Sequence, residues 1–326
     1  MFPRSNTSAR FLCQPKFFKT LLGICATLLL TACGAVTPAP TATRPAPTAM
    51  PSPTVSPDCA PGSHNNELLS GGETRLYILH IPPSYTPKKP VALVFGFHGN
   101  NGQAGQFESY SGFSILADRE GFIVAYPQGS GEHPSWEAWQ GGKDVQFVRD
   151  LIAKLATICN IDPARIYATG HSLGGGMVNR LACDLSERIA AIGPVSGAYQ
   201  DGVHCSPSRP VAIAAVHGTG DSVIYYNGFG VNGSSPAAYF TVGTPIPQWA
   251  SAWAQRNGCN AKAETFFQKG PVSGQQWVNC RSKADVVLYT IRDGEHGWPT
   301  PDANFDVAQT LWDFFEQHPL PSASNH

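Results

Sequence analysis

The chain has 326 residues, a formal net charge of −1 and only 14% charged residues. Nucleic acid is therefore not an expected partner, because no basic stripe is present to neutralise phosphates. The length is sufficient for one α/β domain with a sizeable core, and the low charge favours a protein that works outside the cell on uncharged or insoluble material.

The first 33 residues are typical of an export signal. Four Lys or Arg residues precede an apolar stretch, residues 21–30, that is too short to span a bilayer stably. The stretch ends in Thr31-Ala-Cys33-Gly34, in which a small residue precedes a cysteine, and this resembles a bacterial lipobox. The resemblance implies cleavage before Cys33 and attachment of lipid to its sulfur. The alternative is an ordinary signal peptide that happens to carry a cysteine.

Residues 34–57 alternate Pro with Ala, Thr and Ser. Such a sequence cannot bury a core, and it is typical of a semi-rigid, polyproline-like spacer with a reach of up to about 70 Å. Residues 58–326 then form the predicted folded domain. This order predicts an exported protein that is anchored by lipid on the extracytoplasmic side of a membrane, or is released from it.

Apolar runs and helical periods alternate through the predicted folded domain. Residues 73–82 alternate apolar and polar side chains well enough for an antiparallel edge strand, and residues 91–98 are a continuous apolar run, as in a buried parallel strand. Strands that alternate with helices predict a mostly parallel central sheet with helices on both faces. Further strands are expected at residues 121–126, 165–169, 190–196, 210–217 and 286–291, and helices at residues 107–120, 143–158, 177–183, 249–256 and 305–317.

One stretch organises this chain, Gly170-His171-Ser172-Leu173-Gly174, which has the pattern G-x-S-x-G. The pattern is typical of a nucleophile elbow, a sharp strand-to-helix turn that projects a serine above a sheet and requires small residues two positions away. A predicted strand precedes the stretch and a predicted helix follows it, which is the context that an elbow needs. Residues 58–326 are therefore predicted to be a catalytic domain with the α/β-hydrolase fold.

A serine hydroxyl needs a histidine to take its proton and a carboxylate to orient that histidine. In this architecture the order along the chain is Ser, then Asp or Glu, then His. Asp221 follows the apolar run at 210–217 and His296 follows the last predicted strand, so we expect both at the carboxyl ends of strands. The rival carboxylates are Asp201, Asp293 and Asp302, the later rival bases are His318 and His326, and His98 and His217 are interpreted as structural.

Two backbone N–H groups are needed to stabilise the oxyanion that forms on a substrate. We expect one from Leu173, directly after the serine, and the other from Asn100 in the loop after residues 91–98. Aromatic side chains also gather near these strand ends, where exposed rings suit a sugar, a phenolic acid or a polyester surface; the alternative is that each packs its own loop. The candidate substrate-binding aromatics are Trp136, Trp139, Tyr225, Trp249 and Trp298.

Nine cysteines are present, of which Cys13 and Cys25 leave with the signal and Cys33 is assigned to lipid. The even number that remains predicts three disulfides in an exported domain, with fifteen possible connectivities. Neither C-x-x-C spacing nor an H-E-x-x-H motif is present, so we expect no metal site and no cofactor. Spacing favours the local pairs Cys183–Cys205 and Cys259–Cys280, which leaves Cys59–Cys159.

Further motifs accompany the elbow in one order. They are Pro127-Gln-Gly129, Ser135-Trp136, Asp144-Val-Gln-Phe147, Ile161-Asp-Pro-Ala-Arg165-Ile-Tyr167, His217-Gly-Thr219, Asn257-Gly-Cys259 and His296-Gly-Trp-Pro299. Over residues 59–318 the chain thus resembles the secreted esterase family that contains feruloyl and acetylxylan esterases (carbohydrate esterase family one) and the poly(3-hydroxybutyrate) depolymerase-like lipoproteins. The resemblance implies a triad of Ser172, Asp221 and His296, with an oxyanion donor from Gly99-Asn100. The chain departs from the family pattern at Lys143-Asp144, at Ser135-Trp-Glu-Ala138 and in a Gly- and Ser-rich stretch, residues 228–245, and we interpret these changes as touching the substrate side.

The sequence therefore predicts a serine carboxylic ester hydrolase that works through an acyl-enzyme. The preferred substrate is a feruloyl or acetyl ester on plant cell-wall polysaccharide, and the alternative is poly(3-hydroxybutyrate) or another short-chain polyester. A peptidase on the same fold lacks support, because no acidic pair is present to hold a peptide amino terminus. A catalytically inactive, surface-tethered binding protein is the alternative outside enzymes, and the intact Ser, Asp and His argue against it.

Overall fold

The computed structural model describes residues 56–138, 141–199, 204–228, 243–301 and 305–321. The predicted export signal with Cys33 lies outside the described residues, as do nearly all of the predicted spacer and Trp139.

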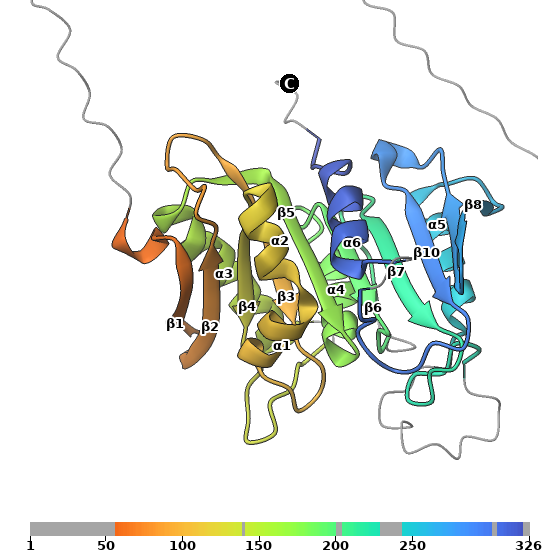
Figure 1. Ribbon diagram of the computed structural model, residues 1–326, viewed down its shortest axis with the longest axis horizontal. Coiled ribbons are helices and arrows are strands. Elements are labelled where there is room, and N and C mark those ends of the chain that lie inside the picture. Colours follow the sequence, from red (N-terminus) through yellow and green to blue (C-terminus); the bar gives the residue numbers. More distant parts are fainter. Residues whose placement is uncertain (1–55, 139–140, 200–203, 229–242, 302–304, 322–326) are drawn as a thin grey trace, which may run out of the picture. The chain divides into compact units, whose positions relative to one another are not determined.

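A ten-stranded sheet runs through the described chain, and its central strands are parallel (Figure 1). The strand order is β1-β2-β4-β3-β5-β6-β7-β10-β9-β8, in which neighbouring strands from β4 to β10 pair in parallel. Antiparallel hairpins, β1 with β2 and β8 with β9, form the two edges. The strands are β1 Gly62–Ser70, β2 Glu73–Ile81, β3 Val91–Phe97, β4 Ile123–Pro127, β5 Ile161–His171, β6 Ala191–Val195, β7 Ala212–Gly218, β8 Glu264–Lys269, β9 Val272–Trp277 and β10 Val286–Ile291.

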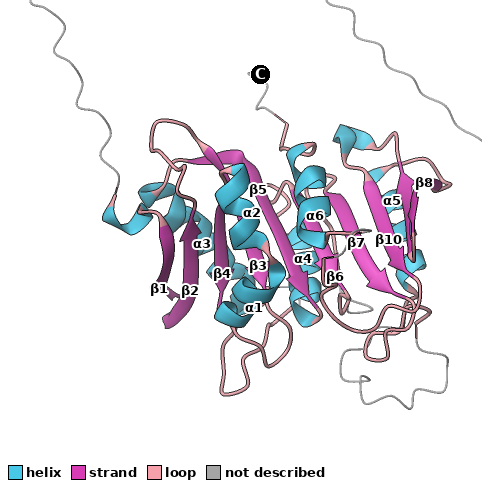
Figure 2. Cartoon of the chain, in the orientation of Figure 1, coloured by secondary structure: helices cyan, strands magenta, loops and turns pink. Residues whose placement is uncertain are grey.

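Helices cover both faces of the sheet (Figures 1 and 2). One core cluster joins the sheet to α3 Lys143–Ile158, α4 Leu173–Asp184 and α5 Ile246–Asn257, and a second joins the other face to α1 Ala104–Ser111, α2 Phe113–Glu120 and α6 Val307–Glu316. Short 3₁₀ helices lie at Pro57–Cys59 (η1) and Arg281–Lys283 (η3). Within the described residues, no helix has both the length and the apolar character needed to cross a membrane.

Strand β3 illustrates why the central strands are continuous apolar runs. Its residues Leu93 and Phe95 belong to the first core cluster, while Ala92 and Val94 belong to the second. Alternate side chains of a strand point to opposite faces, so a strand that is covered on both faces needs apolar residues at every position. All seven residues of β3 are buried, as the sequence pattern predicted.

The structure differs from the sequence expectation at three elements. The single helix expected at residues 107–120 is two helices, because Gly112 between them has a φ of +78°. Residues 73–82 contain β2, which is not the edge strand, because β1 pairs with its outer side and forms the edge of the sheet. In β1, half-buried and exposed residues alternate, but polar side chains lie on both faces. The sequence of β1 therefore lacks the alternation of apolar and polar residues that indicates a strand. The β8–β9 hairpin was also not predicted.

Three disulfides fasten loops to this framework, and they join the pairs that spacing favours. Cys59–Cys159 links η1 to the end of α3 over a sequence separation of 100 residues. Cys183–Cys205 links the end of α4 to the segment before β7, and Cys259–Cys280 links the residues after α5 to those after β9.

Candidate active site

Ser172 lies at the junction of β5 and α4 with a φ of 57° and a ψ of −119°. This is a strained conformation for a residue with a side chain, and such strain is common at functional sites. Glycine is required on both sides of it: a Cβ at Gly170 would lie 2.5 Å from the Gly174 carbonyl oxygen, and a Cβ at Gly174 would lie 2.3 Å from the Phe97 carbonyl oxygen. The G-x-S-x-G spacing thus has a steric cause.

His296 connects Ser172 to Asp221. Its Nε2 lies 3.0 Å from Ser172 Oγ, and its Nδ1 lies 2.9 Å from Asp221 Oδ2. Asp221 follows β7 and His296 follows β10, and these two strands pair in parallel, so their carboxyl ends meet at one edge of the sheet. The structure therefore brings together the three residues that sequence reasoning selected from positions far apart in the chain.

The loops that carry Asp221 and His296 are joined to each other. The Gly220 N–H donates to the Gly294 carbonyl oxygen at 2.9 Å, and the Asp293 N–H donates to Thr219 Oγ1 at 2.8 Å. A Cβ at Gly218 would lie 2.1 Å from the Gly294 carbonyl oxygen, so only glycine permits this approach. The distance between acid and base is thus fixed by backbone contacts as well as by their own hydrogen bond.

Asp221 is buried and accepts more hydrogen bonds than the one from His296. The Ile224 N–H donates to its Oδ1 at 2.7 Å, and His217 Nε2 lies 3.1 Å from its Oδ2. Burial alone would raise the pKa of Asp221, but the hydrogen bonds from His217, His296 and Ile224 outweigh it and hold the pKa well below its usual range. Asp221 is therefore ionised at neutral pH.

His217 is a functional candidate that sequence reasoning set aside as structural. Its side chain is fully buried, and its Nε2 lies within reach of both Asp221 Oδ2 and the Ile224 carbonyl oxygen, at 3.1 and 2.9 Å. A neutral histidine has one N–H, so a proton on Nε2 can serve both acceptors. The available signal was its spacing, four residues before Asp221 at the end of a strand.

The loop after β3 lies against Ser172, where the second oxyanion donor was expected. A Cβ at Gly99 would lie 3.4 Å from Ser172 Cβ, so the backbone of this loop passes directly beside the serine. Asn100 Oδ1 accepts a hydrogen bond from Ser135 Oγ at 2.9 Å, and its side chain is thereby used to shape the loop. Leu173 is the first residue of α4, and N–H groups in the first turn of a helix have no partner within the helix.

Two of the predicted substrate-binding aromatics are buried, which corrects their assignment as exposed rings. Trp136 is 3% exposed and donates its indole N–H to the His98 carbonyl oxygen at 2.7 Å, so it supports the loop that contains Asn100. Trp249 is 8% exposed and stacks on Tyr199 with 3.7 Å between ring centroids. Tyr225, in contrast, is 39% exposed and lies four residues after Asp221.

An aromatic group that includes Trp298 lies beside the triad. Tyr110 of α1 lies 6.5 Å from Trp298 and 6.4 Å from His171, measured between ring centroids, and His171 lies 5.1 Å from His296. Tyr110 is 44% exposed. Sequence reasoning did not select Tyr110, because it lies within a helix and belongs to none of the motifs.

The interpretation of Lys143-Asp144 as part of the substrate side is wrong for Asp144. This carboxylate is fully buried, pairs with Arg75 at 2.5 Å and accepts the Glu137 N–H at 2.6 Å. It therefore fastens the loop at 135–137 to α3 and β2. Among the rivals for the triad, Asp293 is exposed, His318 lies near Asp285 at 3.6 Å, and Asp201, Asp302 and His326 lie outside the described residues.

We expect the stability of the protein to depend on pH through His171. Burial, with a smaller contribution from His296, lowers the pKa of His171 to about 4. The folded state thus favours the neutral ring. The contribution of His171 to the free energy of unfolding is therefore complete above the unfolded pKa of about 6.5, and as much as about 3 kcal/mol is lost as the pH falls toward 4. Urea unfolding at pH 6.5 and at pH 4 measures this loss, which His171→Gln should remove. His204→Gln, which changes an exposed histidine, is the control; an equal pH dependence in His171→Gln and wild type would contradict the expectation.

The described residues contain no group of three or more His, Cys, Asp or Glu side chains arranged to hold a metal ion. At the site itself, Ser172, His296 and Asp221 form one chain of contacts beside backbone N–H groups. That set suits attack by an activated hydroxyl on an acyl carbon.

Comparisons with known proteins agree with this chemistry. Residues 75–225 match a family model described as Esterase PHB depolymerase. The chain is 34% identical over 263 residues to Feruloyl esterase B of Piromyces equi. The matched stretch is 76% of this chain but only 46% of that protein. It is 32% identical over 249 residues to a protein of Aspergillus clavatus named Probable feruloyl esterase C. This matched stretch is 74% of the chain and 83% of that protein.

A solved structure is similar in fold. The acetyl xylan esterase from Aspergillus awamori has a TM-score of 0.57 with this chain, covers 78% of this chain and 99% of its own, and is 15% identical. The likeness at this identity concerns the fold alone. Together with the strand order and the helices on both faces, it shows the α/β-hydrolase fold that the sequence predicted.

Proposed function

Because the chain belongs to the esterase family of PHB depolymerases and feruloyl esterases, we propose that Ser172, His296 and Asp221 hydrolyse its substrate through an acyl-enzyme. The chain is a carboxylic ester hydrolase of the feruloyl and acetylxylan esterase kind. The observation that carries the assignment of roles is the unbroken series of contacts from Ser172 Oγ through both ring nitrogens of His296 to Asp221, at 3.0 and 2.9 Å.

The proposed reaction has two halves. Ser172 Oγ attacks the ester carbonyl carbon while its proton passes to His296 Nε2, and the resulting oxyanion accepts hydrogen bonds from the N–H groups of Leu173 and Asn100. The C–O bond to the alcohol then breaks, and the alcohol leaves with the proton from His296. Water attacks the acyl-enzyme with the same histidine as base, and the acid is released as Ser172 recovers its proton. Asp221 holds His296 in the tautomer that this exchange requires, and His217 positions Asp221.

We infer that the preferred substrate is a feruloyl or acetyl ester on plant cell-wall polysaccharide. Two similar proteins carry the name feruloyl esterase, and the aromatic group of Tyr110 and Trp298 beside the triad suits a phenolic ring. The test is an assay of the full chain on methyl ferulate and on a suspension of poly(3-hydroxybutyrate), side by side. Faster hydrolysis of methyl ferulate supports the proposal, whereas release of hydroxybutyrate alone would assign the alternative, a polyester depolymerase.

Tyr110→Ala should discriminate between substrates. If the phenolic ring packs on Tyr110, its removal should raise KM for methyl ferulate about 3- to 10-fold and change KM for p-nitrophenyl acetate less than about twofold. Steady-state kinetics on both substrates measures the difference. Phe266→Ala, which removes a similarly exposed ring from β8, is the matched control. Equal effects of Tyr110→Ala on both substrates would remove this residue from the acyl subsite.

We also propose that residues 1–33 direct export, that lipid is attached at Cys33, and that residues 34–57 hold the catalytic domain, residues 58–326, away from a membrane. Three disulfides support an oxidising compartment. We expect the wild-type protein, expressed in a bacterium that processes lipoproteins, to sediment with membranes and Cys33→Ser to be found in the soluble fraction. A soluble wild-type protein would favour the ordinary signal peptide.

A further inference from the structure

A cavity of about 720 Å³ lies at the opposite end of the sheet from Ser172. It is lined where β5, β7 and β10 begin, by residues that include Ala164, Ala212 and Ala284, whereas the triad lies where these strands end. The part of β5 between Ala164 and Ser172 separates the two places by roughly 25 Å. The cavity therefore does not belong to the site described above. Its size falls within the range of pockets that hold small organic ligands.

Two cations on this cavity have no carboxylate partner among the described residues. Arg165 is paired with Asp162 at 2.8 Å, and His318 lies 3.6 Å from Asp285, but neither Arg209 nor Lys283 has such a contact within the described part of the chain. The Arg209 guanidinium donates instead to the carbonyl oxygens of Pro210 and Ala190, which fix its position. Burial lowers the pKa of Arg209, as expected for a half-buried cation that lacks a counter-ion.

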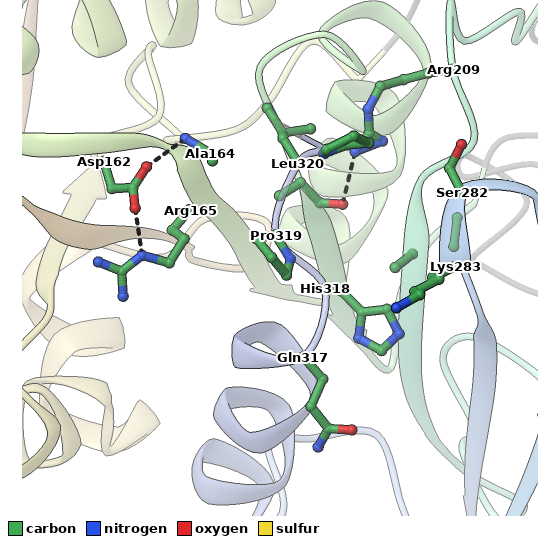
Figure 3. Close-up of a pocket in the computed structure, with 14 residues that line it drawn as sticks. Asp162, Ala164, Arg165, Arg209, Ser282, Lys283, Gln317, His318, Pro319 and Leu320 are labelled. Atoms are coloured by element: carbon green, nitrogen blue, oxygen red, sulfur yellow. Dashed lines mark hydrogen bonds and ion pairs between the residues drawn. The ribbon is translucent and has the colours of Figure 1, made fainter. Parts of the chain in front are cut away.

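The remaining lining is mainly apolar. Ala164, Ala190, Ala212 and Ala284 contribute short side chains, and the C-terminal segment adds Leu320. The Leu320 N–H donates to the Ala164 carbonyl oxygen at 2.8 Å, which holds this segment across the start of β5. Figure 3 shows Asp162 and Arg165 on one side of the cavity, Ser282, Lys283 and His318 on the other, and Pro319 and Leu320 between them.

We propose that this cavity binds an aromatic carboxylate, with the carboxylate facing Arg209 and Lys283 and the ring against the alanines and Leu320. An uncompensated, half-buried guanidinium attracts an anion, and its planar fork matches a carboxylate. The short apolar side chains leave room for a flat ring, which an inorganic anion would not use. We choose a hydroxycinnamate such as free ferulate as the ligand because it is the acid that the proposed esterase releases, so this choice rests on the proposed function. The existence of the binding site does not rest on it.

The test is calorimetric titration of the full chain with ferulate, acetate and sulfate. Arg209→Gln should weaken the binding of ferulate at least tenfold, because it removes a half-buried, charge-assisted contact. Lys283→Gln should weaken it about two- to fivefold, because an exposed cation contributes less. Arg149→Gln, which removes an exposed cation paired with Glu187, should leave this binding unchanged. Tyr110→Ala should weaken only the part of the ferulate titration that comes from the triad. Thermal unfolding confirms that each variant is folded, and the exposed Lys283 keeps the test valid if Arg209→Gln does not fold.

Three results would overturn the proposal. Unchanged binding in both Arg209→Gln and Lys283→Gln would remove the cavity from consideration, and loss of binding in Tyr110→Ala would place ferulate at the triad instead. Sulfate that binds as tightly as ferulate would reduce the cavity to a site for inorganic anions. Failure of the proposed function is distinguishable, because it would abolish hydrolysis of methyl ferulate in the wild type without changing how ferulate binding responds to Arg209→Gln.

Discussion

Ser172→Ala should lower kcat for p-nitrophenyl acetate by about 10⁴- to 10⁶-fold and leave the fold intact. The hydroxyl is the only group removed. In the described structure, no other group lies at 3.0 Å from His296 Nε2 to replace it as nucleophile. Stability should change little, because alanine must adopt the same φ of 57° that serine already adopts. Steady-state kinetics and thermal unfolding of the full chain measure the two effects.

A second measurement reports on the same atom directly. A fluorophosphonate should label the wild type and fail to label Ser172→Ala, because it bonds to the activated serine oxygen. Ser109→Ala, which removes an exposed hydroxyl from α1, should be labelled and active like the wild type. Hydrolysis by Ser172→Ala at the wild-type rate would end the assignment of the nucleophile.

The elbow could be predicted from the sequence because its constraints are local. Gly170 and Gly174 are required by contacts to backbone atoms within the turn and at the end of β3. The G-x-S-x-G pattern expresses this requirement for small residues around the serine. The central strands could be predicted for a similar reason, since coverage of both faces makes every position apolar. Asp221 and His296 could be predicted because the acid and the base follow the serine along the chain and lie directly after strands. This rule depends on the order of the strands and not on any contact between side chains.

What the sequence did not predict depends on contacts between distant segments. A tryptophan serves equally well in a core or on a surface, so the burial of Trp136 and Trp249 was not visible in their loops or helices. The apolar strand around His217 indicates a structural residue, whereas the turn after the strand brings Asp221 Oδ2 within 3.1 Å of its Nε2. Tyr110 lies near the triad because α1 packs on β3 and β4, which places its ring 6.4 Å from that of His171. The pairing of Arg75 with Asp144 likewise joins β2 to α3 across 69 positions.

Asp221→Asn should lower kcat/KM by about 10⁴-fold, although the side chain keeps its size. Asp221 accepts hydrogen bonds from His296 Nδ1, His217 Nε2 and the Ile224 N–H with two oxygens. Asparagine has one oxygen and one NH₂ group, so it opposes at least one of these donors with a donor of its own. If the NH₂ group faces His296, the ring must present a lone pair on Nδ1 and a proton on Nε2, which is the tautomer that cannot take the proton of Ser172.

The same substitution should change the dependence of stability on pH. The pKa of Asp221 is depressed in the folded state, so its contribution to stability is present above the unfolded value of about 3.9 and is lost as the pH falls below it. The difference in unfolding free energy between wild type and Asp221→Asn should therefore shrink as the pH falls from 6 toward 3. Asp293→Asn is the matched control, because Asp293 is exposed and its φ of 58° suits asparagine. Kinetics and urea unfolding of both variants decide the assignment: activity in Asp221→Asn within tenfold of the wild type, or an equal loss in Asp293→Asn, would show that the carboxylate of Asp221 does not orient the base.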